Sequence, residues 1–157
     1  MLSTLKMSSV SPLTIQTVHG GSVAVTEDQL ITVVTPPLGL PHVKRWWLYQ
    51  TETGPLYWLQ SVEDPKLSFC LLAPFQAGLD PDMELGTEEV ADIGAEDVSD
   101  IDIYTVVVLD RDPTQRRTNL RAPILIGRTA GLAKQVVLSD ARLPIRFCLP
   151  DLKTHGH

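Results

Sequence analysis

Trp46-Trp-Leu-Tyr-Gln-Thr-Glu-Thr-Gly-Pro-Leu-Tyr-Trp-Leu-Gln-Ser61 is the stretch that decides the fold class. Two runs rich in aromatic and aliphatic residues, 46–50 and 56–61, flank the polar segment 51–55. Aromatic residues favour strands, and Gly54 can adopt the positive φ that many tight turns need. The stretch therefore predicts a β-hairpin.

The hairpin carries a concentrated aromatic set, and it has two interpretations. One is core packing; the other is an apolar recognition surface, because Trp and Tyr are favoured anchors in protein interfaces. Successive side chains of a strand face opposite sides, so either Trp46 or Trp47 must point away from a single-sided core. The sequence leaves both interpretations open. The aromatic residues are Trp46, Trp47, Tyr49, Tyr57 and Trp58.

Short apolar runs on both sides of the hairpin predict further strands. Gly20-Gly21 predicts a turn near the amino end, and Pro36-Pro37 stops the first run because proline cannot donate to a strand ladder. The longest run, Ile101 to Leu109, is predicted either as a sheet edge that accepts a partner or as a central strand. The predicted strands are 30–35, 67–72, 101–109, 123–126 and 135–138.

One helix is predicted, from Thr87 to about Ile93. Thr87 is a suitable N-cap, and the next two residues are glutamates, which the helix dipole favours in a first turn. Gly94 is placed to end the helix. A second short turn is expected near Ala95.

Seven or eight short strands with one helix predict a mainly β protein: a compact antiparallel β-barrel, or a barrel-like sandwich, with one short helix. At 157 residues and 43% apolar content, the chain is expected to form one domain over residues 13–149. Residues 1–12 and 152–157 are expected to be loose termini.

Several functional classes are disfavoured. No apolar run approaches the length of a membrane span and no secretory signal is visible, so a cytoplasmic location is expected. Cys70 and Cys148 lie in apolar surroundings without metal-ligand spacing, which predicts buried, inert thiols. His155 and His157 are read as part of a frayed tail, and no nucleophile–base pair or phosphate-binding loop is evident. Catalysis, cofactors and metals are therefore not expected.

The segment Leu67–Asp110 contains no lysine or arginine and eleven carboxylates. Such a block is either a solvated face or a surface for a basic partner. From Arg111 onward, nine basic residues face only three aspartates. Direct nucleic-acid binding is disfavoured, because the basic end is opposed by the acidic segment.

Three motifs resemble the flagellar assembly factor family FliW: Trp58-Leu-Gln-Ser-Val-Glu-Asp-Pro, Thr118-Asn-Leu-Arg-Ala-Pro-Ile-Leu-Ile and Lys134-Gln-Val-Val-Leu. The amino-terminal stretch from Leu13 is also similar, and the resemblance runs to about Leu149. The chain departs from the family pattern near its start, where His19 replaces a usual Phe before glycine. It departs again at Gly127, where the family usually has Asn.

The resemblance implies a small β-barrel-like fold that is monomeric when free and has no activity or cofactor. It also implies two partners: flagellin, the filament subunit, and CsrA, an RNA-binding repressor of flagellin translation. In the family, FliW held by flagellin cannot restrain CsrA, whereas free FliW binds CsrA away from its RNA surface and relieves repression. The alternative is a chaperone-like domain dedicated to flagellin, without a CsrA role.

Two sets of partner-binding residues follow. An acidic face is expected to bind the basic CsrA. Strand or turn surfaces are expected to make the second set of partner contacts. Flagellin is expected to bind through the aromatic strands or the 60–62 turn. The acidic set is Glu84, Glu88, Glu89, Asp92, Asp100 and Asp102. The strand and turn set is Gln60, Ser61, Val62, Glu63, Ile103 and Thr105.

Overall fold

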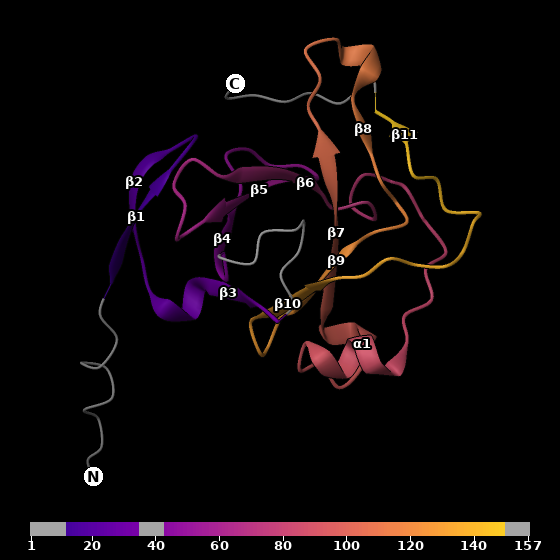
Figure 1. Cartoon of the computed structure of the whole chain (residues 1–157), viewed down its shortest axis with the longest axis horizontal. Helices are drawn as coiled ribbons and strands as arrows, with labels where there is room; N and C mark the ends of the chain where they lie inside the picture. Colours follow the sequence, from indigo (N-terminus) through magenta and orange to yellow (C-terminus); the bar gives the residue numbers. More distant parts are fainter. Residues whose placement is uncertain (1–11, 35–42, 150–157) are drawn as a thin grey trace.

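The computed structural model describes residues 12–34 and 43–149 (Figure 1). The predicted loose termini therefore lie almost entirely outside the described residues, as do the proline pair 36–37 and both carboxyl-terminal histidines. No helix within the described ranges is long and apolar enough to cross a bilayer. In chain order, the strands and the α-helix are β1 (Leu13–Thr17), β2 (Gly21–Val25), β3 (Leu30–Val33), β4 (Arg45–Tyr49), β5 (Leu56–Ser61), β6 (Ser68–Leu72), α1 (Thr87–Asp92), β7 (Ile101–Val108), β8 (Arg117–Thr118), β9 (Ile124–Gly127), β10 (Leu132–Gln135) and β11 (Phe147–Cys148).

The deciding hairpin forms as predicted. Strands β4 and β5 are antiparallel, with Trp46 opposite Ser61 and Tyr49 opposite Trp58. Gly54 in the connecting turn has a φ of 127°, a value that side chains with a Cβ rarely adopt. Strand-forming residues on both sides and one glycine in the turn thus account for the hairpin.

Seven strands close into a barrel, which confirms the predicted fold class. The strand order runs from β7 through β6, β5, β4, β3 and β10 to β9, and β9 pairs with β7 to complete the ring. Closure removes the free edges of a sheet, which would otherwise pair with other chains. The short strands β8 and β11 extend the sheet beside the far end of β7.

One pairing departs from the antiparallel expectation: β3 and β10 are parallel, with Leu132 opposite Thr32. Apolar periodicity cannot show strand direction, which depends on how the chain returns to the barrel. The strand predicted at 135–138 is also displaced, because β10 ends at Gln135. Val136 and Leu138 still donate backbone hydrogen bonds to Pro123 and Arg121, at 2.9 and 2.7 Å.

The aromatic set of the hairpin is used for packing. Trp46 is fully buried inside the barrel with Leu71 and Tyr104. Trp47 points outward, stacks on Tyr49 with ring centroids 4.4 Å apart, and packs beneath the β1–β2 hairpin at the left of Figure 1. The core interpretation therefore fits all these rings better than a recognition surface.

Trp58 is covered by His19. The His19 ring lies 3.8 Å from the Trp58 ring, between centroids, and Trp58 is 6% exposed. A flat imidazole can take the packing position of another ring. The His19 ring thus keeps Trp58 shielded from solvent.

Candidate functional site

Helix α1 spans Thr87–Asp92 inside the acidic segment, as predicted, but its N-cap is Gly86 and not Thr87. The side chain of Glu89 folds back over Gly86, where a Cβ would lie 2.9 Å from Oε1. After Ile93, Gly94 turns the chain with a φ of 70°, in agreement with its predicted role. A 3-10 turn, Val98–Asp100, then leads into β7.

The helix is attached to the barrel through the residue that follows it. Ile93 is fully buried in a cluster with Leu125, Ile101 and Val136, and α1 lies below the lower end of β7 in Figure 1. The carbonyl oxygen of Ile93 lies close to Gly127: a Cβ at Gly127 would be 2.1 Å from that oxygen. The absence of a side chain at Gly127 is therefore what allows α1 to dock in this position.

The segment 79–86, which precedes the helix, forms no helix or strand, and its accessibility alternates as in extended chain. Leu79, Pro81, Met83 and Leu85 are half-buried, and Met83 and Leu85 pack on the cluster beneath α1. The intervening acidic side chains are exposed. Because successive residues of an extended chain face opposite ways, the acids share one face. These acids are Asp80, Asp82 and Glu84.

Half of the predicted acidic set is bonded to residues far away in sequence, two by ion pairs and one by hydrogen bonds. Lys134 Nζ lies 2.7 Å from Asp92, and Arg128 Nη2 lies 3.0 Å from Asp102. Asp100 accepts hydrogen bonds from the backbone and the hydroxyl of Thr129. The hydrogen bond with Asp92 raises the pKa of Lys134. These carboxylates therefore fasten α1 and β7 to the β9–β10 end of the barrel.

The remaining carboxylates form one group, here named the acidic face. None of its members has an ion-pair partner within 4.0 Å among the residues that the structure describes. Glu89 is half-buried and the others are exposed. Three belong to the predicted set, and two were not singled out. The acidic face consists of Asp80, Asp82, Glu84, Glu88 and Glu89.

Gln60 and Ser61, predicted on a turn surface, are both fully buried at the end of β5. The Gln60 amide donates to the carbonyl oxygens of Ser61, Pro65 and Leu67 at 3.0 to 3.2 Å, and it accepts from the Val18 N–H at 2.8 Å. The structure thus places Gln60 and Ser61 inside the protein and not on the expected surface. They fix the β5–β6 turn and attach the β1–β2 hairpin to it.

Substitution of Gln60 by Leu is expected to lower the free energy of unfolding by about 2 kcal/mol, because the Val18 N–H and the turn carbonyls lose buried partners. Urea denaturation measures the change. Gln50→Leu is the matched control: its amide bonds Gly54 at an exposed site, so a change below about 0.5 kcal/mol is expected. Equal losses in the two variants would contradict the structural role of Gln60.

The other predicted strand and turn residues are also involved in internal packing. Thr105 is fully buried and accepts a hydrogen bond from the Thr118 hydroxyl at 2.7 Å. Ile103 is half-buried in the cluster beneath α1. Strand β7 pairs with β6 on one side and with β8 and β9 on the other, so it is central along much of its length. Val62 is half-buried against the β1–β2 hairpin.

Glu63 is the accessible member of that set. Burial disfavours its charged form, yet hydrogen bonds from Arg45 and Lys44 outweigh this effect and lower the pKa of Glu63. The carboxylate thereby joins the β5–β6 turn to the start of β4.

The two cysteines differ, which corrects the expectation that both are buried. Burial raises the pKa of the Cys70 thiol to about 12, so it stays protonated. Cys148 lies in the edge strand β11 and is exposed. Within residues 12–34 and 43–149, no three His, Cys, Asp or Glu side chains lie close enough together to hold a metal ion.

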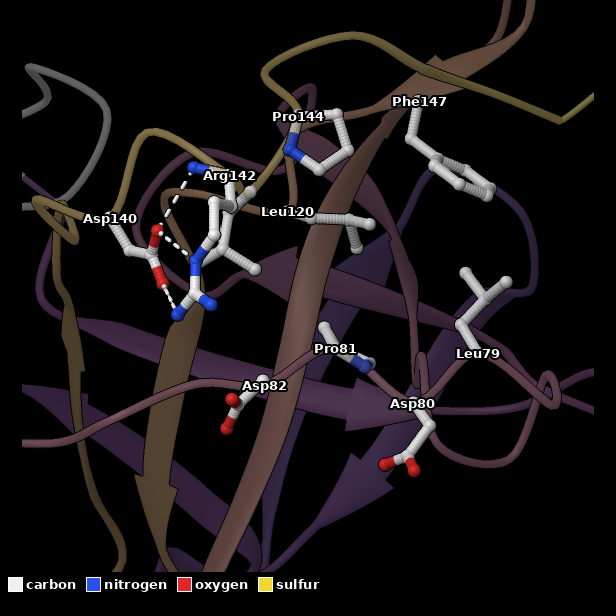
Figure 2. A pocket seen from close by; sticks show the side chains of 10 residues that line it. Leu79, Asp80, Pro81, Asp82, Leu120, Asp140, Arg142, Pro144 and Phe147 are labelled. Carbon is white, nitrogen blue, oxygen red and sulfur yellow. Dashed lines mark hydrogen bonds and ion pairs between the residues drawn. The ribbon is translucent and has the colours of Figure 1, made fainter.

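Sequence reasoning missed an open groove between segments 79–82 and 140–147 (Figure 2). Its volume is about 330 Å³, and more of its lining is apolar than polar. Leu79 and Phe147 lie at one end and the Asp140–Arg142 pair at the other, with buried Leu120 between them. The two walls are about 60 residues apart in sequence, so no local motif marks the groove.

Comparisons with known proteins agree with the fold and its motifs. A sequence model described as FliW protein matches residues 14–149. Proteins named flagellar assembly factor FliW from Caldicellulosiruptor saccharolyticus and Geobacter sulfurreducens are 30% and 31% identical to this chain. Those matches cover 82% and 83% of this chain and 85% and 82% of the respective relatives.

A solved structure gives the same result. The crystal structure of the flagellar assembly factor FliW superimposes with a TM-score of 0.80 and 26% identity, over 87% of this chain and 96% of that one. The barrel, the motifs within β5 and β9, and the agreement over most of both chains lead to one conclusion. The chain belongs to the FliW family.

Proposed function

We propose that the chain is a non-enzymatic flagellar assembly factor of the cytoplasm. In this proposal it binds flagellin and, when free, binds CsrA and prevents it from repressing flagellin translation. Family membership supports the flagellar role. The acidic face supports a basic partner, and it is the observation that carries the CsrA part of the proposal.

An RNA-binding protein needs cationic groups to contact phosphates, so it presents a basic surface. The acidic face has five carboxylates, on α1 and on the extended segment before it. None of the five forms an ion pair with another residue in the part of the chain that the structure describes. Complementary charge accelerates encounter and selects against acidic partners. Asp92, Asp100 and Asp102 serve a different purpose, since their ion pairs and hydrogen bonds hold the helix and β7 in place.

For flagellin, the proposed contact is still the β5–β6 turn. Because Gln60 and Ser61 are buried, the contacting side chain in this proposal is the accessible Glu63. A bulky residue at Ser61 would not test this contact, because that side chain is fully buried and the variant would disturb the barrel. Glu63→Gln tests it better, with flagellin affinity measured alongside unfolding by urea.

The deciding experiment titrates the purified protein with CsrA and with flagellin, singly and together, by isothermal calorimetry. A CsrA complex is expected whose affinity falls as salt is raised, because screening weakens charge attraction. Prior saturation with flagellin is expected to abolish CsrA binding. Since coupling between sites is reciprocal, CsrA bound to this protein should also bind its RNA more weakly.

Each other outcome has a definite meaning. Flagellin binding without CsrA binding would support the chaperone-like alternative and reject the regulatory role. Simultaneous binding of both partners with unchanged affinities would reject the proposed coupling between flagellin export and translation. Absence of both complexes would reject the whole proposal.

A further inference from the structure

We infer that the groove between segments 79–82 and 140–147 binds an extended cationic segment of a protein partner, with an aliphatic side chain inserted into the groove. The groove shares Asp80 and Asp82 with the acidic face, so the inference rests on the proposed function and deepens it by naming the chemistry of the bound segment. Three features of the groove carry it: an apolar floor, a net negative charge, and a wall at residues 140–147 that is already fixed.

The floor is suited to an aliphatic side chain. Leu79 and Phe147 are half-buried at one end, Leu120 and Leu143 are buried at the base, and Pro144 is exposed at the rim. A volume of about 330 Å³ is at the small end of ligand pockets, which suits a few side chains of a peptide better than a whole helix. Burying one aliphatic side chain here would provide most of the apolar contact.

The charge of the groove selects a cationic neighbour for that side chain. Asp80 and Asp82 line one wall, and their carboxylates point away from Leu120 and Pro144 in Figure 2. On the opposite wall, Arg142 donates to Asp140 at 2.8 and 3.1 Å, so that pair is neutral as a whole. This pairing lowers the pKa of Asp140 to about 2, which keeps the carboxylate ionised. Arg142 also interacts electrostatically with Asp82 across the groove, but three aspartates and one arginine leave the lining with a net charge of −2.

The spacing of the acids indicates an extended segment. Asp80 and Asp82 are two residues apart in extended chain, and Glu84 continues the same row. Side chains on one face of an extended chain repeat every 7 Å, roughly. A second extended chain repeats at the same interval, so lysines or arginines two residues apart would meet two carboxylates at once.

The wall formed by residues 140–147 is held in shape without a ligand. Arg121 donates from Nε to the Leu143 carbonyl at 2.9 Å and from Nη2 to the Ala141 carbonyl at 3.0 Å. The Leu120 N–H donates to the Pro144 carbonyl at 3.0 Å. A site that is already formed spends little binding energy on ordering its own loops. This supports a groove that serves binding and not a gap left by loose packing.

The first test uses three synthetic pentapeptides and the full chain labelled with ¹⁵N. The probe peptide is Gly-Lys-Leu-Lys-Gly, and its controls replace both lysines by glutamate or the leucine by serine. Amide shift changes are expected at residues 79–82 and 140–147 with the probe. The glutamate peptide should produce none, and the serine peptide should bind at least about fivefold more weakly, as expected for a lost buried side chain. Equal shifts with all three peptides, or shifts confined to other parts of the chain, would overturn the inference.

The second test uses the double variant Asp80→Lys, Asp82→Lys, with Glu27→Lys as the control at an exposed acid outside the acidic segment. A native amide spectrum establishes that each variant is folded. The double variant is expected to lose the probe peptide, whereas the control keeps its affinity within about twofold, since an exposed ion pair outside the groove contributes little. Undiminished binding by the folded double variant would refute the charge argument. Neither test contains CsrA or flagellin, so its failure leaves the proposed function to be judged by the titrations.

Discussion

Replacement of Gly127 by Asn is expected to lower the free energy of unfolding by about 3 kcal/mol and to displace α1 from the barrel. A Cβ at this position would lie 2.1 Å from the Ile93 carbonyl oxygen, which is backbone and cannot rotate away. Either the helix moves, which exposes the fully buried Ile93, or β9 shifts within the barrel. An Asn at position 127 is thus expected to be incompatible with this chain's helix position.

The measurement is urea denaturation combined with amide spectra of α1. Gly86→Asn is the matched control, because it makes the same substitution at the other end of the helix. There the nearest atoms belong to the flexible Glu89 side chain, and Asn is a favoured N-cap, so unchanged or slightly raised stability is expected. If both variants are equally stable and α1 keeps its spectrum, the close approach at Gly127 does not position the helix.

Much of the fold could be predicted because it is encoded locally. The hairpin around Gly54 follows from strand propensity and a turn residue, and α1 follows from its acidic first turn and Gly94. Strand direction is not encoded in this way. The parallel pairing of β3 with β10 joins segments about 100 residues apart, and nothing in either pattern states which way the second strand runs.

The candidate site was predicted less completely, for two physical reasons. Charge is visible in sequence, but its neutralisation is not: Lys134 reaches Asp92 across 42 positions and Arg128 reaches Asp102 across 26. The second reason is that a polar side chain can be buried when other groups of the protein satisfy its hydrogen bonds, and sequence does not show where this happens. Gln60 has the composition of a surface residue, yet its amide is satisfied by surrounding backbone groups, so it can be buried.

Reversal of three carboxylates on the acidic face, Glu84→Lys, Glu88→Lys and Glu89→Lys, is expected to weaken CsrA binding by at least about 30-fold at low ionic strength. Like charges brought together at an interface oppose association by several kcal/mol. The loss should shrink as salt is raised, because screening reduces the repulsion. Calorimetric titration at two salt concentrations measures both effects. Asp92 is left unchanged, since a lysine there would face Lys134 and disturb the attachment of α1.

The matched control carries three lysines outside the acidic segment, at Glu27, Asp28 and Glu52, and so has the same net charge. If net charge alone governs encounter, the two variants lose affinity equally. If α1 and the segment before it form the contact, the first variant loses binding and the control retains most of it. Unchanged flagellin affinity in the first variant would place the two partners on different surfaces, so that flagellin excludes CsrA through a change in the protein. Equal loss for both partners would instead mean that they compete for the acidic face directly.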